Sequence, residues 1–543
     1  MFHFLMGIVS YLTLNFTYKW LKSPVIHQEL INSSQTTVVA SLKEGSSLWC
    51  IDDTKSKRIC KFRYLCYHPV QDHFLFFHGP ETVIDGVPDN RFDPALLDLS
   101  SVDDHNTQYF NYVDYPVSAL DTFSNITVMD GFSLIFNRFN ADNIMHVVHD
   151  DLLPLFHTLR QFSWSRSSID LEYTLVMMEG WNEGAYFDLY KLFTNKPPLL
   201  KRDLQKPKQL ICFQHGVVGI SKYTTWYQYG FKEPQGALPH TSVTGHYVRQ
   251  FVMFIKRRLG LDSGLINAYD SSYVILCSRE HNRLITNEPD LSMAIARHLN
   301  KQVIHISMTI HAFKEQVQLV SKASALIGMH GSILIMAMFL PPDLPWMDIV
   351  YGAWRNEIEE NTITYPHEAP EVGGIVHLSD EEQKQIMGTK EVPRHLCCSN
   401  PYWLYRIYQD TTVDIKSLLL VTETAENKQR KMSSRPKPAY DHTLYPSKVI
   451  NVTCQLPPEE LQPALWFSWE PPLNIPFIAG RDVRYEVWIQ PSGQENYAAY
   501  ILDLTEYTFT ENLLRNTHYN VWVRCIVNEN SGPFGDVAHC ETK

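Results

Sequence analysis

The chain has 543 residues and a mass of 62.9 kDa, which excludes a single small binding module and corresponds to about three or four domains. Its 44% hydrophobic and 20% charged residues are typical of packed domains and exclude a mainly disordered chain. The formal net charge of -12 excludes a general electrostatic surface for nucleic acid, so an anionic ligand would need a local pocket.

The first 18 residues carry no formal charge if His3 is neutral, and this apolar run ends at Lys19 and Lys22. It is just long enough to cross a bilayer. Neither a basic leading region nor a small-residue cleavage site is present, so we expect an uncleaved anchor over residues 1–21 rather than a cleaved signal peptide. A polar stem is predicted over residues 22–48.

The ten cysteines are even in number, and they form neither a C-x-x-C pair nor a Cys/His cluster at zinc-finger spacing. We therefore expect disulfides, of open connectivity, rather than a structural metal. Three accessible sequons predict N-glycosylation at Asn32, Asn125 and Asn451. Together with the anchor, these features favour a single-pass type II membrane protein whose globular part is lumenal, although Lys19 and Lys22 alone would favour the opposite orientation.

Two changes of composition divide the rest of the chain. Residues 422–445 are polar, basic and interrupted by prolines, which is typical of a linker. Residues 446–543 consist of short alternating runs separated by Pro, Gly and Asn, which predicts a β-sandwich. The predicted main domain, residues 49–421, lies before the linker.

Strands and helices alternate in the second half of this main domain, which predicts a parallel sheet. The expected strands are 273–277, 303–306 and 325–327, and the expected helices are 291–299, 313–320 and 333–339. A second α/β unit is expected upstream, with strands at 132–136, 173–178 and 210–213 and a helix over 142–162. The main domain is therefore predicted to be α/β with two lobes, about 49–240 and 241–421.

The predicted helix 142–162 carries Asn143, His146, His149 and Asp150. His146 and Asp150 are four residues apart and share one helix face, and a carboxylate beside an imidazole can remove a proton from a hydroxyl group. A polar helix face with local ion pairs is the alternative. A metal hydrolase using both histidines is a weaker one, because the pattern departs from H-E-x-x-H.

Two further groups follow predicted strands, at the position where parallel sheets bind anions. Arg279 and Arg283 could hold a diphosphate through bidentate hydrogen bonds, or they could form surface ion pairs. His330-Gly331-Ser332 would allow close approach of a phosphate to the backbone, or could be a plain strand-to-helix turn. There is no D-x-D motif, and metal dependence stays open.

In order, N-x-x-H-x-x-x-D from Asn143, S-R-x-x-x-R-x-x-x-N-E from Ser278 and the His330-Gly331 pair resemble the glycosyltransferase family that contains EGF-domain-specific O-GlcNAc transferase and plant xylosyltransferases. The resemblance extends from about Cys50 to the end of the chain. The final block, with Trp469 and Tyr519, resembles a fibronectin type III domain, which could hold the acceptor or act only as a spacer.

The resemblance implies a GT-B-like two-lobed α/β glycosyltransferase domain of the endoplasmic reticulum membrane, followed by an all-β fibronectin type III sandwich. It implies inverting transfer of N-acetylglucosamine from UDP-GlcNAc to the 4-position of O-linked mannose on proteins, as in α-dystroglycan-type glycan synthesis, without a covalent intermediate. The implied roles are catalytic for Asp150 or His146, donor-binding for Arg279, Arg283, Asn287, His330, Gly331 and Ser332, and acceptor or cleft contacts for Asn143, Arg138 and Trp226.

One departure from the family concerns the region after Pro341. There the chain lacks a segment that would supply a further strand of the nucleotide lobe, unless residues 346–351 replace it. The alternative expectation is therefore a catalytically impaired member that binds a glycopeptide or a nucleotide.

Overall fold

A computed structural model describes most of the chain from residue 46 onward. The described residues are 46–79, 82–102, 108–123, 125–162, 169–205, 210–229, 236–238, 243, 245–261, 273–281, 283–307, 309–329, 331–341, 379–381, 384, 410, 412–416, 418–420, 422, 445–455, 463–478, 482–494 and 496–542. The predicted anchor, most of the predicted stem and residues 346–351 lie outside them. Within the described part, no helix is long and apolar enough to cross a membrane.

The first lobe is built on a sheet of nine strands, whose main path runs in the order β10-β9-β8-β11-β2-β1-β4, with β3 joining β2 to β7. Strands β8, β9, β10 and β11 are parallel, whereas β2 is antiparallel to β1, β3 and β11. The strands are β1 Ser47–Ile51, β2 Ile59–His68, β3 His73–His78, β4 Val83–Asp85, β7 Tyr112–Pro116, β8 Ile126–Phe136, β9 Thr174–Met177, β10 Leu199–Leu200 and β11 Leu210–Val218.

Only the 126–218 part of this sheet follows the predicted α/β alternation. The strands of residues 47–116 form antiparallel pairs and two parallel pairs, β1–β4 and β3–β7, which the sequence analysis did not include. Strand β1 begins two residues inside the predicted stem. Short elements complete the lobe: β5 Leu97–Asp98, β6 Tyr109–Phe110, η1 Val117–Thr122, α5 Phe187–Tyr190, η3 Lys191–Phe193, η4 Lys201–Leu204, β12 Tyr227–Gln228 and β13 Gly236–Ala237.

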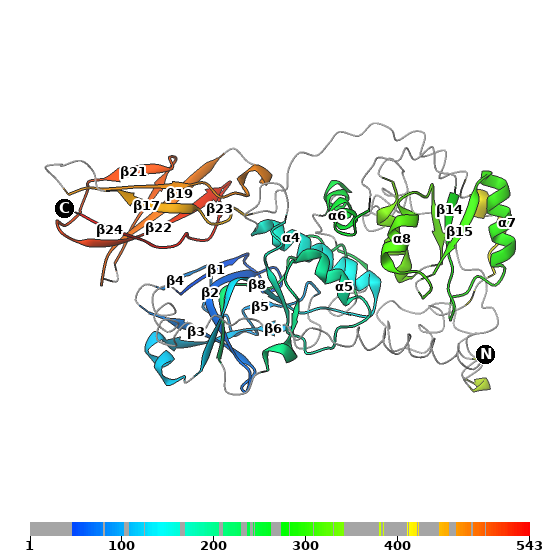
Figure 1. Ribbon diagram of the computed structural model, residues 1–543, viewed down its shortest axis with the longest axis horizontal. Helices are drawn as coiled ribbons and strands as arrows, with labels where there is room; N and C mark the ends of the chain where they lie inside the picture. The colour runs from blue at the N-terminus through cyan, green and yellow to red at the C-terminus, as the bar shows by residue number, and fades with distance from the viewer. Residues whose placement is uncertain are drawn as a thin grey trace, which may run out of the picture.

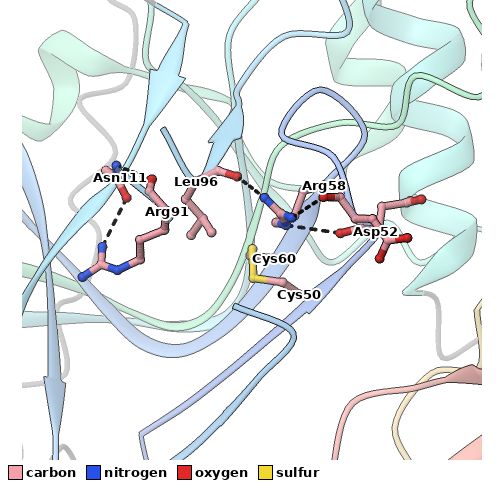
Figure 2. Close-up of a disulfide and its surroundings, with 8 residues drawn as sticks. Cys50, Asp52, Arg58, Cys60, Arg91, Leu96 and Asn111 are labelled. Carbon is pink, nitrogen blue, oxygen red and sulfur yellow. Dashed lines mark hydrogen bonds between the residues drawn. A yellow bond between two sulfur atoms is a disulfide. The ribbon is translucent and has the colours of Figure 1, made fainter. Parts of the chain in front are cut away.

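Two disulfides stabilise the first lobe, as the cysteine count predicted. Cys50–Cys60 joins β1 to β2, and Cys66–Cys212 joins β2 to β11. Beside the first of them, the buried Arg58 donates to the main-chain carbonyls of Asp52 and Leu96 (Figure 2). The antiparallel half of the sheet is therefore fixed by covalent bonds as well as by packing.

One long helical segment covers the sheet of the first lobe. It consists of α3 Ile144–His146, the π-helical turn η2 Val147–Leu152 and α4 Leu153–Gln161. The predicted helix 142–162 is thus confirmed. Helix α6, Gly245–Arg258, packs against α4 and continues the apolar core toward the second lobe.

The second lobe contains a three-stranded parallel sheet in the order β15-β14-β16, which confirms the predicted parallel pairing. Helices lie on the sheet as the alternating pattern predicted (Figure 1). The elements are β14 Tyr273–Cys277, α7 Glu288–Leu299, β15 Gln302–Ile306, α8 Phe313–Val320, β16 Leu326–Gly328 and the 3-10 helix η6 Ser332–Phe339.

The C-terminal region contains only β-strands and one short 3-10 helix, and it lies at the opposite end of the molecule from the second lobe (Figure 1). One of its sheets has the order β17-β18-β21, and the other has β20-β19-β22-β23 with β24 beside β22. The elements are β17 Ile450–Gln455, β18 Leu465–Glu470, η9 Ile475–Phe477, β19 Val483–Pro491, β20 Ala498–Leu502, β21 Glu506–Phe509, β22 His518–Val527, β23 Asn530–Ser531 and β24 Ala538–Glu541.

The C-terminal region has its own apolar core and a disulfide, Cys454–Cys540. It is joined to the first lobe by hydrogen bonds near the end of α4. Gln161 exchanges two hydrogen bonds with the main chain of Tyr445, and Asn474 donates to the carbonyl of Gln161. Of the predicted glycosylation sites, Asn125 and Asn451 are exposed, and Asn32 lies outside the described residues.

Candidate functional site

The first candidate group lies where the helical segment of the first lobe begins. The side chain of Asn143 caps this segment by accepting a hydrogen bond of 3.0 Å from the N–H of Met145. The chain then forms the π-helical turn η2, a feature that occurs frequently at functional sites. His146, just before the turn, and His149 within it both face Asp150.

Asp150 is fully buried and accepts hydrogen bonds from three side chains. His146 Nδ1 lies 2.8 Å from Oδ2, and His149 Nδ1 lies 2.5 Å from Oδ1. The hydroxyl of Tyr229 donates to Oδ2 at 2.7 Å. A buried carboxylate is stable only when it is paired and hydrogen-bonded in this way.

The tautomer of His149 follows from its main-chain contact. The N–H of Trp226 donates to Nε2 of His149 at 3.0 Å, so Nε2 is the acceptor and the ring proton lies on Nδ1. His149 therefore donates that proton to Asp150. The backbone carbonyl of Asp150 is fixed as well, because it accepts a hydrogen bond of 2.5 Å from the hydroxyl of Ser101.

His146 is the member of the cluster that reaches the surface, with 17% of its side chain exposed against 0% for Asp150. Phe139 and Tyr229 each contact its ring edge to face, with centroids 4.8 Å away. When Nδ1 donates to Asp150, the opposite nitrogen, Nε2, carries the basic lone pair. The geometry thus presents one oriented basic nitrogen.

The charge state of Asp150 follows from its neighbours. Burial alone would raise the pKa of Asp150, but His149 and the hydrogen bonds from both imidazoles hold that pKa below its usual value. Burial and the adjacent Asp150 raise the pKa of Tyr229 well above its usual value, so its hydroxyl remains a donor. The carboxylate is therefore ionised and its hydrogen bonds are all charge-assisted.

The neighbouring carboxyl group, Asp151, points to the other side of the helix. It accepts hydrogen bonds from the N–H of Phe139 at 3.1 Å and from the hydroxyl of Tyr190 at 2.5 Å. Burial raises the pKa of Asp151 well above its usual value, against the effect of the bond from Tyr190. This residue joins the helical segment to the loop after β8 and to α5.

Two residues predicted to contact the acceptor are buried, which corrects those assignments. The guanidinium of Arg138 has no exposed surface and pairs with Glu179 at 2.6 Å. Trp226 is only 1% exposed, and its ring lies edge-on to His149 with centroids 4.2 Å apart. Trp226 thus supports His149, whereas Arg138 holds the segment 179–183 through Glu179 and the carbonyls of Asn182 and Glu183.

The second candidate group lies at the carboxyl edge of the parallel sheet in the second lobe. Cys277 and Gly328 are paired in register at the ends of β14 and β16, so the loops that follow leave the same edge. A Cβ atom added to Gly331 would lie 2.3 Å from Nη1 of Arg279 and 3.2 Å from Nη1 of Arg283. Both guanidinium groups therefore lie against the backbone of Gly331, as an anion site requires.

Of the other predicted donor residues, Ser332 begins η6 directly after Gly331, and His330 lies outside the described residues. Asn287 has a different contact from the one predicted. Its amide nitrogen donates to the carbonyl of Val413 at 2.8 Å, and its amide oxygen accepts from the N–H of Val413 at 2.9 Å. Asn287 thus fixes the later segment of the chain onto α7 and supports the edge indirectly.

The two candidate groups belong to one packed unit. Helix η6, which follows Gly331, packs against α3, which ends at His146, and against α6 and α8. A single apolar core includes residues of both lobes, with Ile144 and Met336 among its fully buried members. Within the described part of the chain, no group of three or more His, Cys, Asp or Glu side chains is placed to hold a metal ion.

Comparison with known proteins places both groups in a family. Residues 133–346, which include both, match the model described as Glycosyltransferase 61. The chain is 44% identical to a Xenopus laevis protein named protein O-linked-mannose beta-1,4-N-acetylglucosaminyltransferase 2, over 94% of this chain and 91% of that protein. The Homo sapiens protein of the same name is also 44% identical, over 92% of this chain and 90% of that protein.

The chain belongs to the glycosyltransferase 61 family. Among solved structures, the FN5 domain of Drosophila Lar matches 18% of this chain at 21% identity, but a TM-score of 0.14 carries no argument about the fold. As a glycosyltransferase 61 member, the chain has its two candidate groups near the start and the end of the region that matches the family.

Sequence reasoning missed two members of the Asp150 cluster in this family member. Tyr229 lies about eighty residues after Asp150, and its aromatic neighbourhood suggested only stacking or core packing. Ser101 lies 49 residues before Asp150 in an unremarkable serine pair. No spacing rule joins these residues to the helix, because their approach depends on the fold of the sheet.

Proposed function

We propose that this protein transfers N-acetylglucosamine from UDP-GlcNAc to the 4-hydroxyl of O-linked mannose on proteins, with inversion at the anomeric carbon. The named relatives support the reaction and the acceptor class. One structural observation carries the proposal: a single core holds an oriented imidazole–carboxylate pair, His146 and Asp150, and a two-arginine anion site against Gly331.

His146 is the proposed base. Its Nε2 would accept the proton of the mannose 4-hydroxyl while that oxygen attacks the anomeric carbon of the sugar and the bond to UDP breaks. Asp150 holds the ring in the required tautomer and stabilises the imidazolium that forms, as the carboxylate does in other such pairs. Arg279 and Arg283 would stabilise the charge that develops on the departing diphosphate. No covalent enzyme intermediate is needed.

The proposal includes a GT-B-like arrangement of the two lobes and a fibronectin type III identity for the C-terminal region. A three-stranded and a five-stranded antiparallel sheet share one apolar core there, in support of a fibronectin-like sandwich. The hydroxyl of Tyr519 accepts a hydrogen bond of 2.7 Å from the N–H of Leu514, which is the geometry of a tyrosine corner. Trp469 packs edge-on against Tyr485 in the core.

The first test is incubation of the purified protein with UDP-GlcNAc and an O-mannosyl threonine peptide, followed by mass spectrometry. Addition of one N-acetylhexosamine to the mannosyl peptide, and none to the unmannosylated peptide, is the expected result. Transfer to the unmannosylated peptide, or release of a sugar other than N-acetylglucosamine, would contradict the proposed substrates.

A catalytically impaired binding protein is the second candidate, and two observations favour it. Within the described residues, β16 is the last strand of the parallel sheet and lies at its edge, where the missing family segment would add a strand. The alignment with the Xenopus laevis relative extends over 537 residues although it covers only 94% of 543, so part of it consists of gaps in this chain. UDP binding by calorimetry without any transfer would establish this alternative.

The location is proposed on the same basis. We expect an endoplasmic reticulum membrane protein with residues 1–21 as its anchor and the catalytic part in the lumen. Glycans at the exposed Asn125 and Asn451 would require this orientation. The test is enzymatic removal of N-glycans, which should lower the mass of the protein. The triple variant Asn32→Gln, Asn125→Gln and Asn451→Gln should show no such loss of mass. A wild-type chain without glycans would contradict the proposed location.

A further inference from the structure

A cavity of about 50 Å³ lies between the nine-stranded sheet and the C-terminal region. None of the residues that line it belongs to the two candidate groups. Residues of β1, β2, β4 and β11 form one wall, and residues 522 and 533–537 form the other. In Figure 1, β1 and β4 lie directly beside the C-terminal strands. A volume of this size holds about four water molecules or one small oxyanion.

Three cationic side chains line this cavity: Lys61 and Arg63 from β2, and Lys448 from the segment before β17. One carboxylate lies among them. Asp536 Oδ2 is 2.9 Å from Nζ of Lys448, and Oδ1 is 3.6 Å from Nη1 of Arg63. The Asp536 side chain is 62% exposed, so it lies at the rim while the cations lie deeper.

The second carboxylate of the cavity, Asp85, offsets only part of the remaining charge. It pairs with Arg524, which also lies 2.7 Å from Glu486. These three groups form their own network on the strands of the C-terminal region and β4. That network has two carboxylates and one guanidinium, whereas the Lys61, Arg63, Lys448 and Asp536 group has three cations and one carboxylate, so one excess positive charge remains around the cavity.

Two nitrogen atoms in the group lack partners. Among the described residues, the ammonium of Lys61 makes no hydrogen bond or ion pair, and Nε of Arg63 is buried without an acceptor. Burial and the nearby Lys448 lower the pKa of Lys61 to about 7, against the attraction of Asp536. Burial and the same lysines lower the pKa of His215 to about 3, so His215 adds no charge.

We propose that this cavity is a binding site for a small oxyanion of the phosphate or sulfate class. Such an ion would offset the excess positive charge and supply acceptors to Lys61 and to Nε of Arg63. A nucleotide is too large for the cavity. Because Lys448 belongs to the C-terminal region and Lys61 to the sheet, the ion would also join the two parts.

The test is the thermal unfolding of the full chain with phosphate, with sulfate, and with chloride at matched ionic strength. Phosphate or sulfate at 10 mM is expected to raise the unfolding temperature by about 2 °C or more above chloride. Lys61→Met, which keeps the apolar stem, and Lys448→Met, on the opposite wall, should each abolish that increase. Lys61→Met should also raise the unfolding temperature in chloride, because burial and the nearby Lys448 disfavour the Lys61 cation.

Two controls locate the bound ion. Lys191→Met removes an exposed lysine that pairs with Asp188, and it should keep the full increase. Arg279→Met removes one guanidinium of the proposed donor site, so any part of the increase that it abolishes belongs to phosphate bound there and not in the cavity. The proposal is wrong if chloride gives the same increase, if both Lys61→Met and Lys448→Met retain it, or if Arg279→Met alone abolishes it.

Discussion

The two candidate groups of this protein differ in how their side chains are satisfied. In the first lobe, Asp150 and His149 are fully buried and bound to each other, and the partly exposed His146 and Tyr229 also bind Asp150. In the second lobe, Arg279 and Arg283 lie in loops beyond strand ends, against the bare backbone of Gly331. One group is a network of hydrogen bonds around a buried carboxylate, and the other is a pair of guanidinium groups at a sheet edge, where we propose that an anion binds.

This difference indicates a division of work. A closed network fixes the orientation and tautomer of one ring, which is what a proton acceptor needs. An open edge with two guanidinium groups can bind a diphosphate and release it. Changes in the first lobe are therefore expected to alter turnover with little effect on nucleotide affinity. Changes in the second lobe are expected to alter nucleotide affinity more than turnover.

The largest expected effect comes from His146→Ala. Removal of a general base reduces the rate of such reactions by about 10²–10⁴-fold, while affinity for UDP should be unchanged because Arg279 and Arg283 are untouched. Transfer to the O-mannosyl peptide and UDP titration by calorimetry measure the two quantities. His73→Ala, a partly exposed histidine on β3 outside both candidate groups, is the matched control and should leave both unchanged. Full activity of His146→Ala would disprove the assignment of the base.

The next largest effect is expected for Gly331→Ala. The added Cβ would lie 2.3 Å from Nη1 of Arg279, so the flexible guanidinium must move away. We expect UDP affinity to fall by about tenfold or more, as charge-assisted hydrogen bonds are lost, with little change in stability. Gly79→Ala is the control, because its Cβ would meet only Val117 at 3.6 Å. Unchanged UDP affinity in Gly331→Ala would show that the anion binds elsewhere.

A smaller effect is expected for Tyr229→Phe, which removes one donor from Asp150 and keeps the ring contact with His146. Turnover should fall by about three- to tenfold, consistent with the loss of one buried hydrogen bond. Asp150 would then have a less depressed pKa, so the loss of stability in acid should begin at a higher pH. Unfolding temperatures between pH 7 and pH 3 measure this shift, and the exposed Tyr507→Phe should not show it.

Much of the fold was predictable because local patterns specify it. The strands at 273–277 and 303–306, the helix at 313–320 and the cap at Asn143 follow from apolar periodicity and capping chemistry. The antiparallel strands of residues 47–116 were not predicted as part of the sheet, because their pairing joins residues far apart in sequence. Cys66 pairs with Cys212 across 146 residues, and no spacing rule indicates that partner.

The candidate site was predictable only in part. His146 and Asp150 were found because four-residue spacing places them on one helix face. The tautomer of His149 could not be predicted, since it depends on the main-chain N–H of Trp226. The burial of Arg138 could not be predicted either, because a charged residue just after a strand is usually exposed, and Arg138 is buried with its partner Glu179. Sequence gives the residues that a helix or a loop brings together, and the tertiary fold decides which of them face solvent.

The smallest effect, and the finest test of the comparison, concerns the adjacent carboxylates of the first lobe. The pKa of Asp150 is lowered in the folded protein, so its contribution to stability is present at neutral pH and is lost as the pH falls below about 4. The pKa of Asp151 is raised, so its contribution is present in acid and is lost as the pH rises through that raised pKa.

Asp150→Asn should therefore destabilise the protein by about 1–3 kcal/mol at neutral pH, since it leaves the donors of His146, His149 and Tyr229 without a charged acceptor. Asp151→Asn keeps an oxygen for the N–H of Phe139 and should change stability by less than about 1 kcal/mol. Relative to the wild type, the free energy of unfolding of Asp150→Asn should decrease as the pH rises from 3 to 6. That of Asp151→Asn should increase as the pH rises from 4.5 to 8. Denaturant unfolding across this range measures both, and trends of the same sign would mean that the two carboxylates are not in opposite charge states.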